Sequence, residues 1–245
     1  MKLYPVGIQI LMKYFIFFGQ NPIFILKFAK YLTEKSICFN PVKNSDMNKV
    51  IQLAILASGN GTNAQQIAEH FANSQSVNVN VIIYNKRDAY VAKRAETLGI
   101  EAHYFNRHAF LETDDVLHFL QQRNIDYVIL AGFLLLVPQN LLDAFPNRIV
   151  NIHPALLPKY GGKGMYGHNV HEAVVAHHEK ETGITIHIVD NHYDRGTTLF
   201  QARCAVDPVD SPDDVAAKIH ILEKTWFPKV IEAFVLGKPM PVQES

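Results

Sequence analysis

The sequence is poor in cysteine and has no excess of either charge. Its 245 residues contain only Cys38 and Cys204, which form no Cys-x-x-Cys or Cys/His spacing. A zinc or disulfide framework is therefore excluded, and we expect two reduced thiols. The 23 basic and 23 acidic side chains sum to zero. A neutral chain is not typical of a protein that binds nucleic-acid phosphates, so we expect no nucleic-acid partner.

The first 46 residues lack a hydrophobic run long enough to span a membrane. Their longest uncharged run, residues 14–26, follows Lys13 and contains Gln20, Asn21 and Pro22. A spanning helix needs about 20 mostly apolar residues. Neither a small-residue cleavage site nor an Arg/Ser-rich transit pattern is present. We therefore expect no membrane contact and keep a membrane-tethered, non-catalytic protein only as an alternative.

Charge divides the chain into two pieces. Residues 1–46 carry six Lys against Glu34 and Asp46, a net charge of +4, which leaves −4 for residues 47–245. Met47 stands directly before a strand-like run, as at the start of many α/β domains. We therefore predict that residues 1–46 are an N-terminal extension, either dispensable or the product of a start site placed too far upstream. Residues 47–245 are predicted to form one domain.

Strand-like and helix-like segments alternate from residue 51 onward. Strands are predicted at residues 51–57, 77–84, 102–105, from 126 and 148–153, and helices at 64–71, 88–98 and 113–123. Alternation of this kind predicts βαβ units with parallel strands and right-handed crossovers. The fold class is therefore α/β, with a doubly wound, mostly parallel sheet.

The C-terminal part has a different pattern. A predicted helix at residues 171–178 is followed by two strand-like runs, TGITIHIV and TTLFQARCAV, which the loop DNHYDRG separates. A loop of that length between strands is often functional. Ser211 is predicted to cap a helix that runs to Phe234, with Pro212 at its first position and acidic residues in its first turn.

Polar residues follow two of the predicted strands. The segment SGNGTN, residues 58–63, stands between a strand and a helix, where free backbone N–H groups bind anions. It matches neither the dinucleotide fingerprint nor the lysine-bearing phosphate loop. A plain turn with Asn63 as helix cap is therefore an equal alternative.

Asn151 and His153 are two residues apart at the end of a predicted strand, so their side chains share one side of the chain. An amide and an imidazole in that arrangement can both address one oxyanion. Asp194 is a candidate third member, because a carboxylate beside the imidazole would raise its pKa. A turn-forming aspartate is the other interpretation. The ten other histidines show no metal-ligand spacing, so no metal site is expected.

Taken together, these motifs resemble the phosphoribosylglycinamide formyltransferase family. The resemblance rests on SGNGTN, DYVILAGF, IVNIHPALLPKYGGKG, TGITIHIVD, DRGTTLFQA and SPDDVAAKIHILEKTWFP, in order from Lys49 to Phe234. It implies a Rossmann-like fold and a cytoplasmic enzyme without a metal. The implied reaction transfers the formyl group of 10-formyltetrahydrofolate to glycinamide ribonucleotide in de novo purine (IMP) biosynthesis.

The resemblance also implies roles for individual residues. His153 would be the general acid, Asn151 a second donor to the oxyanion, and Asp194 the carboxylate that raises the pKa of His153. The implied ribonucleotide-binding residues are Gly61, Thr62, Asn63, His220 and Glu223. The implied folate-binding residues are Leu134, Leu135, Leu136, Val137, Asn151, Asp190, Asn191, His192, Tyr193 and Asp194.

Two departures from the family pattern bear on these roles. Leu134 and Leu135 stand where relatives often carry Met-Arg, and His220 stands where Gln is common. A related hydrolase, formyltetrahydrofolate deformylase, is an alternative, but it usually has a preceding regulatory domain and a His in place of Pro154. Methionyl-tRNA formyltransferase would need a basic C-terminal domain, and only about fifty residues follow Asp194. The sequence carries no signal for an oligomeric state.

Overall fold

Seven strands form one sheet in the computed structural model of the chain, which describes residues 49–243. The predicted extension at residues 1–46 and Cys38 therefore lie outside the described residues. The sheet order is β3-β2-β1-β4-β5-β6-β7. The parallel strands are β1 (Ile51–Ala57), β2 (Val77–Tyr84), β3 (Glu101–Tyr104), β4 (Tyr127–Leu130) and β5 (Ile149–His153). β6 (Glu181–Ile188) and β7 (Thr198–Ala205) are antiparallel to their neighbours. The predicted doubly wound, mostly parallel sheet is confirmed.

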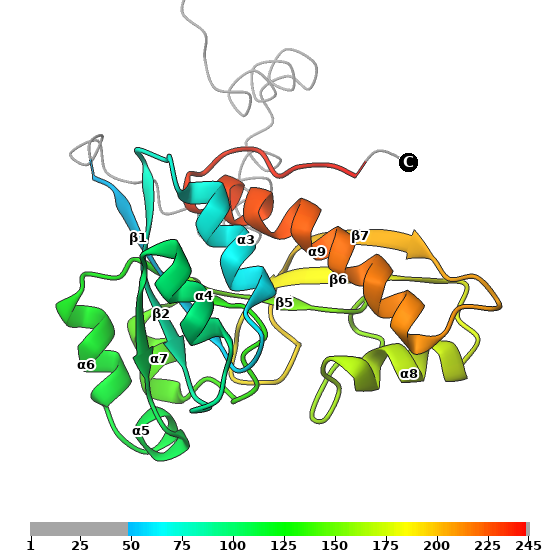
Figure 1. Ribbon diagram of the computed structural model, residues 1–245, viewed down its shortest axis with the longest axis horizontal. Helices are drawn as coiled ribbons and strands as arrows, with labels where there is room; N and C mark the ends of the chain where they lie inside the picture. The colour runs from blue at the N-terminus through cyan, green and yellow to red at the C-terminus, as the bar shows by residue number, and fades with distance from the viewer. Residues whose placement is uncertain (1–48, 244–245) are drawn as a thin grey trace, which may run out of the picture. The chain divides into compact units, whose positions relative to one another are not determined.

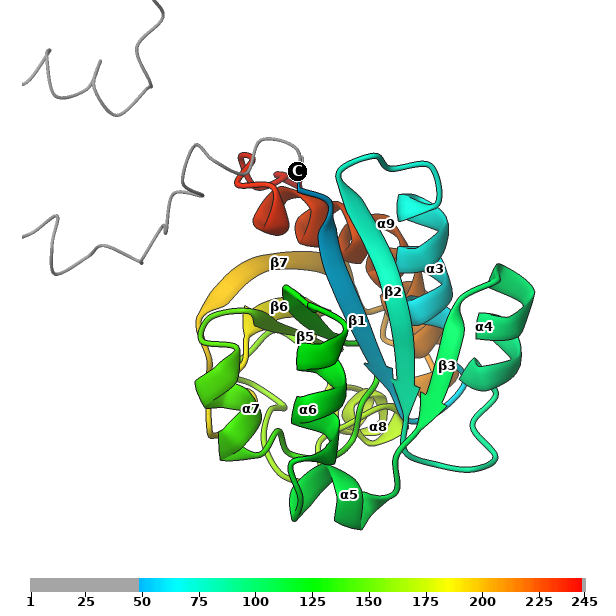
Figure 2. The same ribbon diagram turned by 90° about the vertical axis from the view of Figure 1, so that its left-hand side faces the viewer.

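Helices cover both faces of this sheet (Figures 1 and 2). One face is covered by α3 (Thr62–Phe71), α4 (Val91–Leu98), α8 (His168–Ala176) and α9 (Pro212–Val235). The other is covered by α5 (Arg107–Leu111), α6 (Asp115–Gln122) and α7 (Gln139–Ala144). In Figure 2, α6 and α7 lie on one side of the strands and α3, α4 and α9 on the other.

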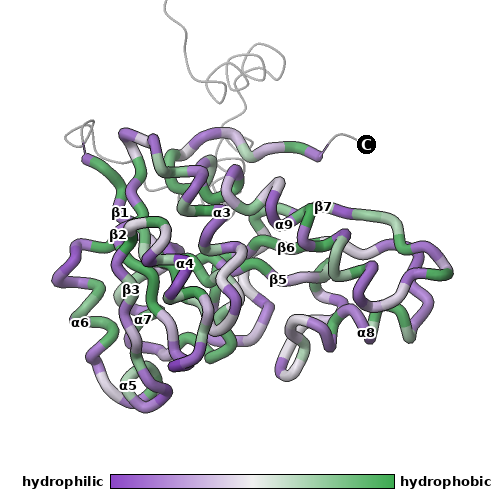
Figure 3. Tube along the Cα trace, viewed as in Figure 1, coloured by the Kyte–Doolittle hydropathy of each residue, from purple (hydrophilic) through white to green (hydrophobic). Residues whose placement is uncertain are grey.

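The sequence of β1 reflects its burial on both sides. Leu53 and Ile55 face the hydrophobic core under α3 and α9, whereas Ala54 and Leu56 face the core under α6. All four side chains are fully buried. A strand covered on both faces is continuously apolar rather than alternating, and Figure 3 shows hydrophobic stretches along the central strands.

Some helix boundaries differ from the predicted ones. The helix expected from residue 88 begins at Val91. The residues before it form a turn, in which the Ala89 N–H donates to the Lys86 carbonyl, and the Val91 N–H donates to the Gly59 carbonyl. The helix expected from residue 171 begins at His168. The sequence did not indicate α5 or α7, since helices of five and six residues are too short for a periodic pattern.

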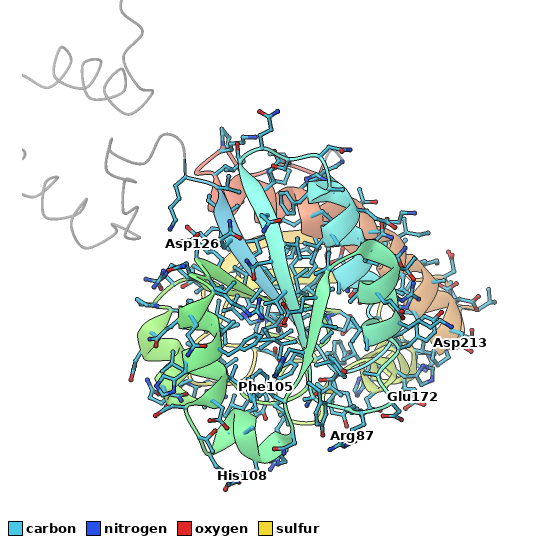
Figure 4. The ribbon with its side chains drawn as sticks, turned by 60° about the vertical axis from the view of Figure 1, so that its left-hand side comes forward. Arg87, Phe105, His108, Asp126, Glu172 and Asp213 are labelled. Carbon is cyan, nitrogen blue, oxygen red and sulfur yellow. The ribbon has the colours of Figure 1, made fainter. Side chains whose placement is uncertain are left out.

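The loops after β1 and β4 meet at the point where the strand order reverses. The Ser58 N–H donates to the Gly132 carbonyl at 3.0 Å, and the Leu134 N–H donates to Ser58 Oγ at 3.0 Å. Ligands of open α/β sheets bind at this kind of crevice, at the carboxyl ends of the strands. Asp126, labelled in Figure 4, lies at the amino ends, where it pairs with Lys49 at 2.6 Å.

The start of α9 has the predicted cap. Ser211 Oγ accepts a hydrogen bond from the Asp214 N–H at 3.2 Å, and Asp214 Oδ2 accepts one from the Ser211 N–H at 2.9 Å. Pro212 occupies the first helical position, where its missing N–H has no helical partner to lose. The longest helix of the described chain therefore begins at a point set by local sequence.

Replacing Ser211 by Ala should lower the free energy of unfolding by about 1 kcal/mol, because one helical N–H loses its acceptor. Urea denaturation monitored by circular dichroism measures this change. Val209→Ala, at a nearby side chain that is 92% exposed, is the matched control and should have a much smaller effect. Equal stability of the Ser211→Ala variant and the original protein would contradict the prediction.

Candidate functional site

A cavity of about 670 Å³ opens at the carboxyl ends of the parallel strands. Its wall brings together most of the residues that the sequence singled out: residues 61–63, 134–137 and 192–194, Asn151, His153, His220 and Glu223. Asp190 and Asn191 are not in the lining. Asp190 instead accepts a hydrogen bond from the His192 N–H at 2.8 Å, and Asn191 is exposed.

The centre of the cavity is built on β5 and β6. Asn151 and His153 both line the cavity from β5, as their spacing predicted, and Asn151 pairs with His187 across the β5–β6 ladder. Asn151 Nδ2 donates to His187 Nε2 at 3.1 Å, and His187 Nδ1 donates to the Ile188 carbonyl at 3.1 Å. Both contacts are satisfied when the proton of His187 is on Nδ1.

His187 is a functional candidate that the sequence-based interpretation missed. Its side chain is 2% exposed and lines the cavity. A histidine among apolar residues of a strand is a weak signal by itself. Its position opposite Asn151 depends on the pairing register of β5 and β6, which one sequence does not specify.

Asp194 reaches the same point from the loop between β6 and β7. Its Oδ1 is 3.6 Å from His153 Nδ1 and 3.7 Å from His187 Nε2. Its Oδ2 accepts a hydrogen bond from the Gly162 N–H at 2.9 Å, and its φ of 54° is in the left-handed region. Asp194 therefore belongs to a tight turn and to the cavity at once, so the two interpretations of this residue are compatible.

The direction of the pKa of His153 corrects one expectation. Burial lowers the pKa of His153 below its ordinary value, although the Asp194 carboxylate and the hydrogen bond to Tyr160 act to raise it. Asp194 thus acts on this pKa in the predicted direction, but the expected net increase is not found, because desolvation of the nearly enclosed imidazole outweighs the attraction. For Asp194, burial acts to raise the pKa, but His187, His153 and the Gly162 N–H hold it below its ordinary value.

Both ring nitrogens of His153 face protein groups. Nε2 donates to the Tyr160 carbonyl at 2.7 Å, while Nδ1 faces Asp194. A carbonyl can only accept, so Nε2 carries the proton of the neutral ring. A ligand that takes a hydrogen bond from Nε2 must displace this carbonyl.

Thr185, opposite His153 in the ladder, holds the chain that leads from His153 to Tyr160. The fully buried Thr185 donates from Oγ1 to the Ala155 carbonyl at 2.7 Å and accepts from the Leu157 N–H at 3.0 Å. Gln201 Nε2 donates to Thr185 Oγ1 at 2.9 Å and to the Leu157 carbonyl at 3.1 Å. Neither side chain was indicated by the sequence, because each acts through a strand neighbour.

The wall after β1 has the shape expected of an anion site. Gly61, with φ 77°, is the residue before α3, and no side chain caps the helix, so the interpretation of Asn63 as the cap is wrong. A Cβ at Gly61 would lie 2.4 Å from a methyl carbon of Val91. The first N–H groups of α3 therefore have no side-chain acceptor, and residues 61–63 line the cavity.

Arg94 is a second residue that the sequence-based interpretation missed. Its Nε donates to the Asn60 carbonyl at 2.7 Å, and its Nη2 donates to Asn60 Oδ1 at 3.0 Å. The guanidinium carbon lies 5.1 Å from the centre of the Tyr90 ring. Arg94 therefore fixes the loop before α3 and adds a positive charge beside it.

His220 and Glu223, one turn apart on α9, bond to each other. His220 Nδ1 donates to Glu223 Oε2 at 3.1 Å, and this contact raises the pKa of His220. The Glu223 side chain is 9% exposed and that of His220 is 65% exposed. The pair places a charged hydrogen-bonding group in the cavity wall.

The described residues contain neither a metal site nor a membrane-spanning helix. Among residues 49–243, no group of three or more His, Cys, Asp or Glu side chains is arranged to hold a metal ion. Within the same range, no helix has the length and apolar character needed to cross a membrane.

Sequence comparison finds a family match and named relatives. The family described as formyl transferase matches residues 51–231. The chain is 38% identical over 189 residues to a chloroplastic phosphoribosylglycinamide formyltransferase of Arabidopsis thaliana, covering 74% of this chain and 64% of the relative. It is 31% identical over 193 residues to phosphoribosylglycinamide formyltransferase of Escherichia coli, covering 77% and 89%. The matched part thus spans less than two thirds of the plant relative.

Solved structures agree with the sequence comparison. Glycinamide ribonucleotide transformylase 1 from Symbiobacterium toebii superposes with a TM-score of 0.70 at 33% identity, covering 77% of this chain and 89% of that one. Phosphoribosylglycinamide formyltransferase from Streptococcus pneumoniae gives a TM-score of 0.67 at 36% identity, covering 76% and 99%.

The balance of burial and charge at His153 predicts the effect of removing the Asp194 carboxylate. In an Asp194→Asn variant, the pKa of His153 should fall further, because the lost charge is the main influence that raises it. Nuclear magnetic resonance titration of the imidazole measures the pKa. Asp213→Asn, at an exposed aspartate on the first turn of α9, should leave it unchanged. A pKa of His153 that rises in Asp194→Asn would refute the argument.

Proposed function

This chain belongs to the formyl transferase family, and we propose that it transfers the formyl group of 10-formyltetrahydrofolate to the amino group of glycinamide ribonucleotide. The relatives named above, at 31% and 38% identity, support this choice of reaction. The observation that carries the proposal is the convergence of His153 and His187 on Asp194 inside one cavity, with Asn151 bonded to His187. The reaction would be a step of de novo purine (IMP) biosynthesis.

In the proposed reaction, the amine nitrogen of the ribonucleotide attacks the formyl carbon. The formyl oxygen gains the negative charge of a tetrahedral intermediate, and Asn151 and His153 are its hydrogen-bond donors. The bond from carbon to N10 of the folate then breaks. N10 takes up a proton as the attacking nitrogen loses one, and tetrahydrofolate leaves.

The protonation of His153 would change as negative charge develops on the formyl oxygen. In the free protein, burial favours the neutral imidazole. An oxyanion beside the ring would favour the protonated form, and Asp194 acts in the same direction. The proton affinity of His153 would therefore increase as the oxyanion forms. His153 would then bind the transition state more strongly than the substrate.

The two substrates would occupy different walls of the cavity. We assign the ribonucleotide phosphate to residues 61–63 at the start of α3, and the ribose or amine to His220 and Glu223. Arg94 would stabilise the phosphate loop from behind. The negatively charged ligand would thus meet backbone N–H groups and a nearby cation.

The folate would lie along the apolar walls. Residues 134–137 and 192–194 line the cavity, and Leu134 and Tyr193 are each 39% exposed at its surface. An apolar slot suits a flat pterin ring. Asp190 and Asn191 are outside the lining, so the folate site proposed here no longer includes them. We keep Asn151 and Asp194 in the proposed folate site, because both substrates would approach these two residues.

The cytoplasm remains the proposed compartment of this enzyme. The relative from Arabidopsis thaliana is named chloroplastic, which describes that protein. Fractionation of the source cells, with an antibody against the described domain, decides between a cytoplasmic and an organellar location.

The proposed reaction is tested with the purified full chain and 10-formyltetrahydrofolate, with and without glycinamide ribonucleotide. We expect tetrahydrofolate to be released only when the ribonucleotide is present, in equal amount to formylated ribonucleotide. Release that is the same without the ribonucleotide would instead identify a formyltetrahydrofolate deformylase. No release under either condition would refute both.

His153→Ala and Asp194→Asn should each lower kcat by about 10²-fold or more, the usual scale for acid–base and oxyanion groups. Thermal melting should show that both variants remain folded. His178→Ala, an exposed histidine outside the cavity lining, is the control and should keep full activity. A folded His153→Ala variant with undiminished kcat would remove His153 from the mechanism.

A further inference from the structure

His171 is a buried histidine with a role in neither the sequence motifs nor the proposed mechanism. It is on the first turns of α8, lines the cavity and is 4% exposed. Its Nδ1 is enclosed and has no hydrogen-bond partner within the described part of the chain. Buried polar atoms are nearly always paired, because an unpaired one destabilises the fold.

His171 Nδ1 differs in its position from the other buried polar atoms that lack a partner. Two further buried atoms lack partners among residues 49–243, Asn80 Oδ1 and Asn85 Oδ1, and neither residue lines the cavity. His171 is thus an unpaired polar side chain in the wall of a binding site. Its missing partner is therefore expected to arrive with a ligand.

The surroundings of His171 identify which ligand. α8 packs against α9, as Figure 1 shows, and α9 supplies His220 and Glu223. The ionisable groups that face His171 are His220, Glu223, His168 and His153. Burial and the three histidines lower the pKa of His171, and only Glu223 opposes them. A neutral imidazole can both donate and accept hydrogen bonds.

We propose that His171 is a ribonucleotide-binding residue, whose imidazole hydrogen-bonds to the part of glycinamide ribonucleotide between the phosphate and the reacting amine. This inference rests on the proposed function. His171 lies among the groups assigned to that substrate, His220 and Glu223, and also faces His153, where the chemistry occurs.

A purely structural role of His171 predicts that substitution leaves the binding of both substrates unchanged. If His171 only filled space, an apolar side chain would pack as well or better, because it leaves no nitrogen unpaired. His171→Phe keeps a flat ring, and His171→Leu tests a smaller apolar side chain if Phe overfills the site. His171→Asn restores a polar atom close to the position of Nδ1.

The experiment measures steady-state kinetics and thermal melting for these variants of the full chain. We expect His171→Phe or His171→Leu to melt at or above the original temperature. Each should raise the KM for glycinamide ribonucleotide about tenfold, the scale of one neutral hydrogen bond, and leave the KM for 10-formyltetrahydrofolate unchanged. His171→Asn should recover much of the loss. The increase in melting temperature produced by ribonucleotide alone should shrink in parallel.

His168→Ala is the matched control on the same helix. His168 is half exposed and contacts Glu172 at 3.4 Å and Asp213 at 3.8 Å, both labelled in Figure 4, and it does not line the cavity. Its KM values should not change. An unchanged ribonucleotide KM in a folded His171→Phe or His171→Leu variant would overturn the inference. Absence of formyl transfer by the original protein would instead refute the proposed function.

Discussion

The antiparallel pairing of β5 with β6 is the constraint on which the site depends. Its register places Asn151 opposite His187 and His153 opposite Thr185. A slip of one residue would turn Asn151 and His153 away from the cavity, because side chains alternate between the two faces of a sheet. β6 ends at Ile188, opposite Val150, so the loop that follows it begins beside β5. Asp194 in that loop therefore meets both imidazoles, although 41 residues separate it from His153 in the sequence.

Burial and charge act against each other at this centre. Enclosure disfavours the protonated form of His153, yet it also strengthens every electrostatic interaction inside the cavity. The pKa of Asp194 stays below its ordinary value because the two imidazoles and the Gly162 N–H outweigh its desolvation. A carboxylate that stays charged inside the protein supplies a fixed field. Such a field stabilises positive charge on His153 when an oxyanion forms nearby.

Around the cavity, some polar groups support the fold from behind its wall, and one polar group in the wall has no structural partner. Thr185 and Gln201 make all their hydrogen bonds within the protein and hold the loop beyond His153. His171 has an enclosed nitrogen for which residues 49–243 provide no partner. An unpaired buried atom lowers stability, so a ligand-binding role accounts for its presence better than packing does. His171 therefore differs from Thr185 and Gln201 in having a polar atom that the fold leaves unpaired.

The sequence by itself determined the features that depend on neighbours along the chain. The apolar run of β1, the shared direction of Asn151 and His153, the glycine turn before α3 and the Ser211 cap all follow from spacing and local propensity. Only the tertiary structure decided which distant residues complete the site. His187 enters through a strand register, Arg94 through the packing of α4 beside the loop after β1, and His171 through the packing of α8 on α9. The tertiary structure also decided the direction in which the pKa of His153 is shifted. Desolvation depends on all the atoms that enclose the imidazole, and Asp194 is only one of the groups around it.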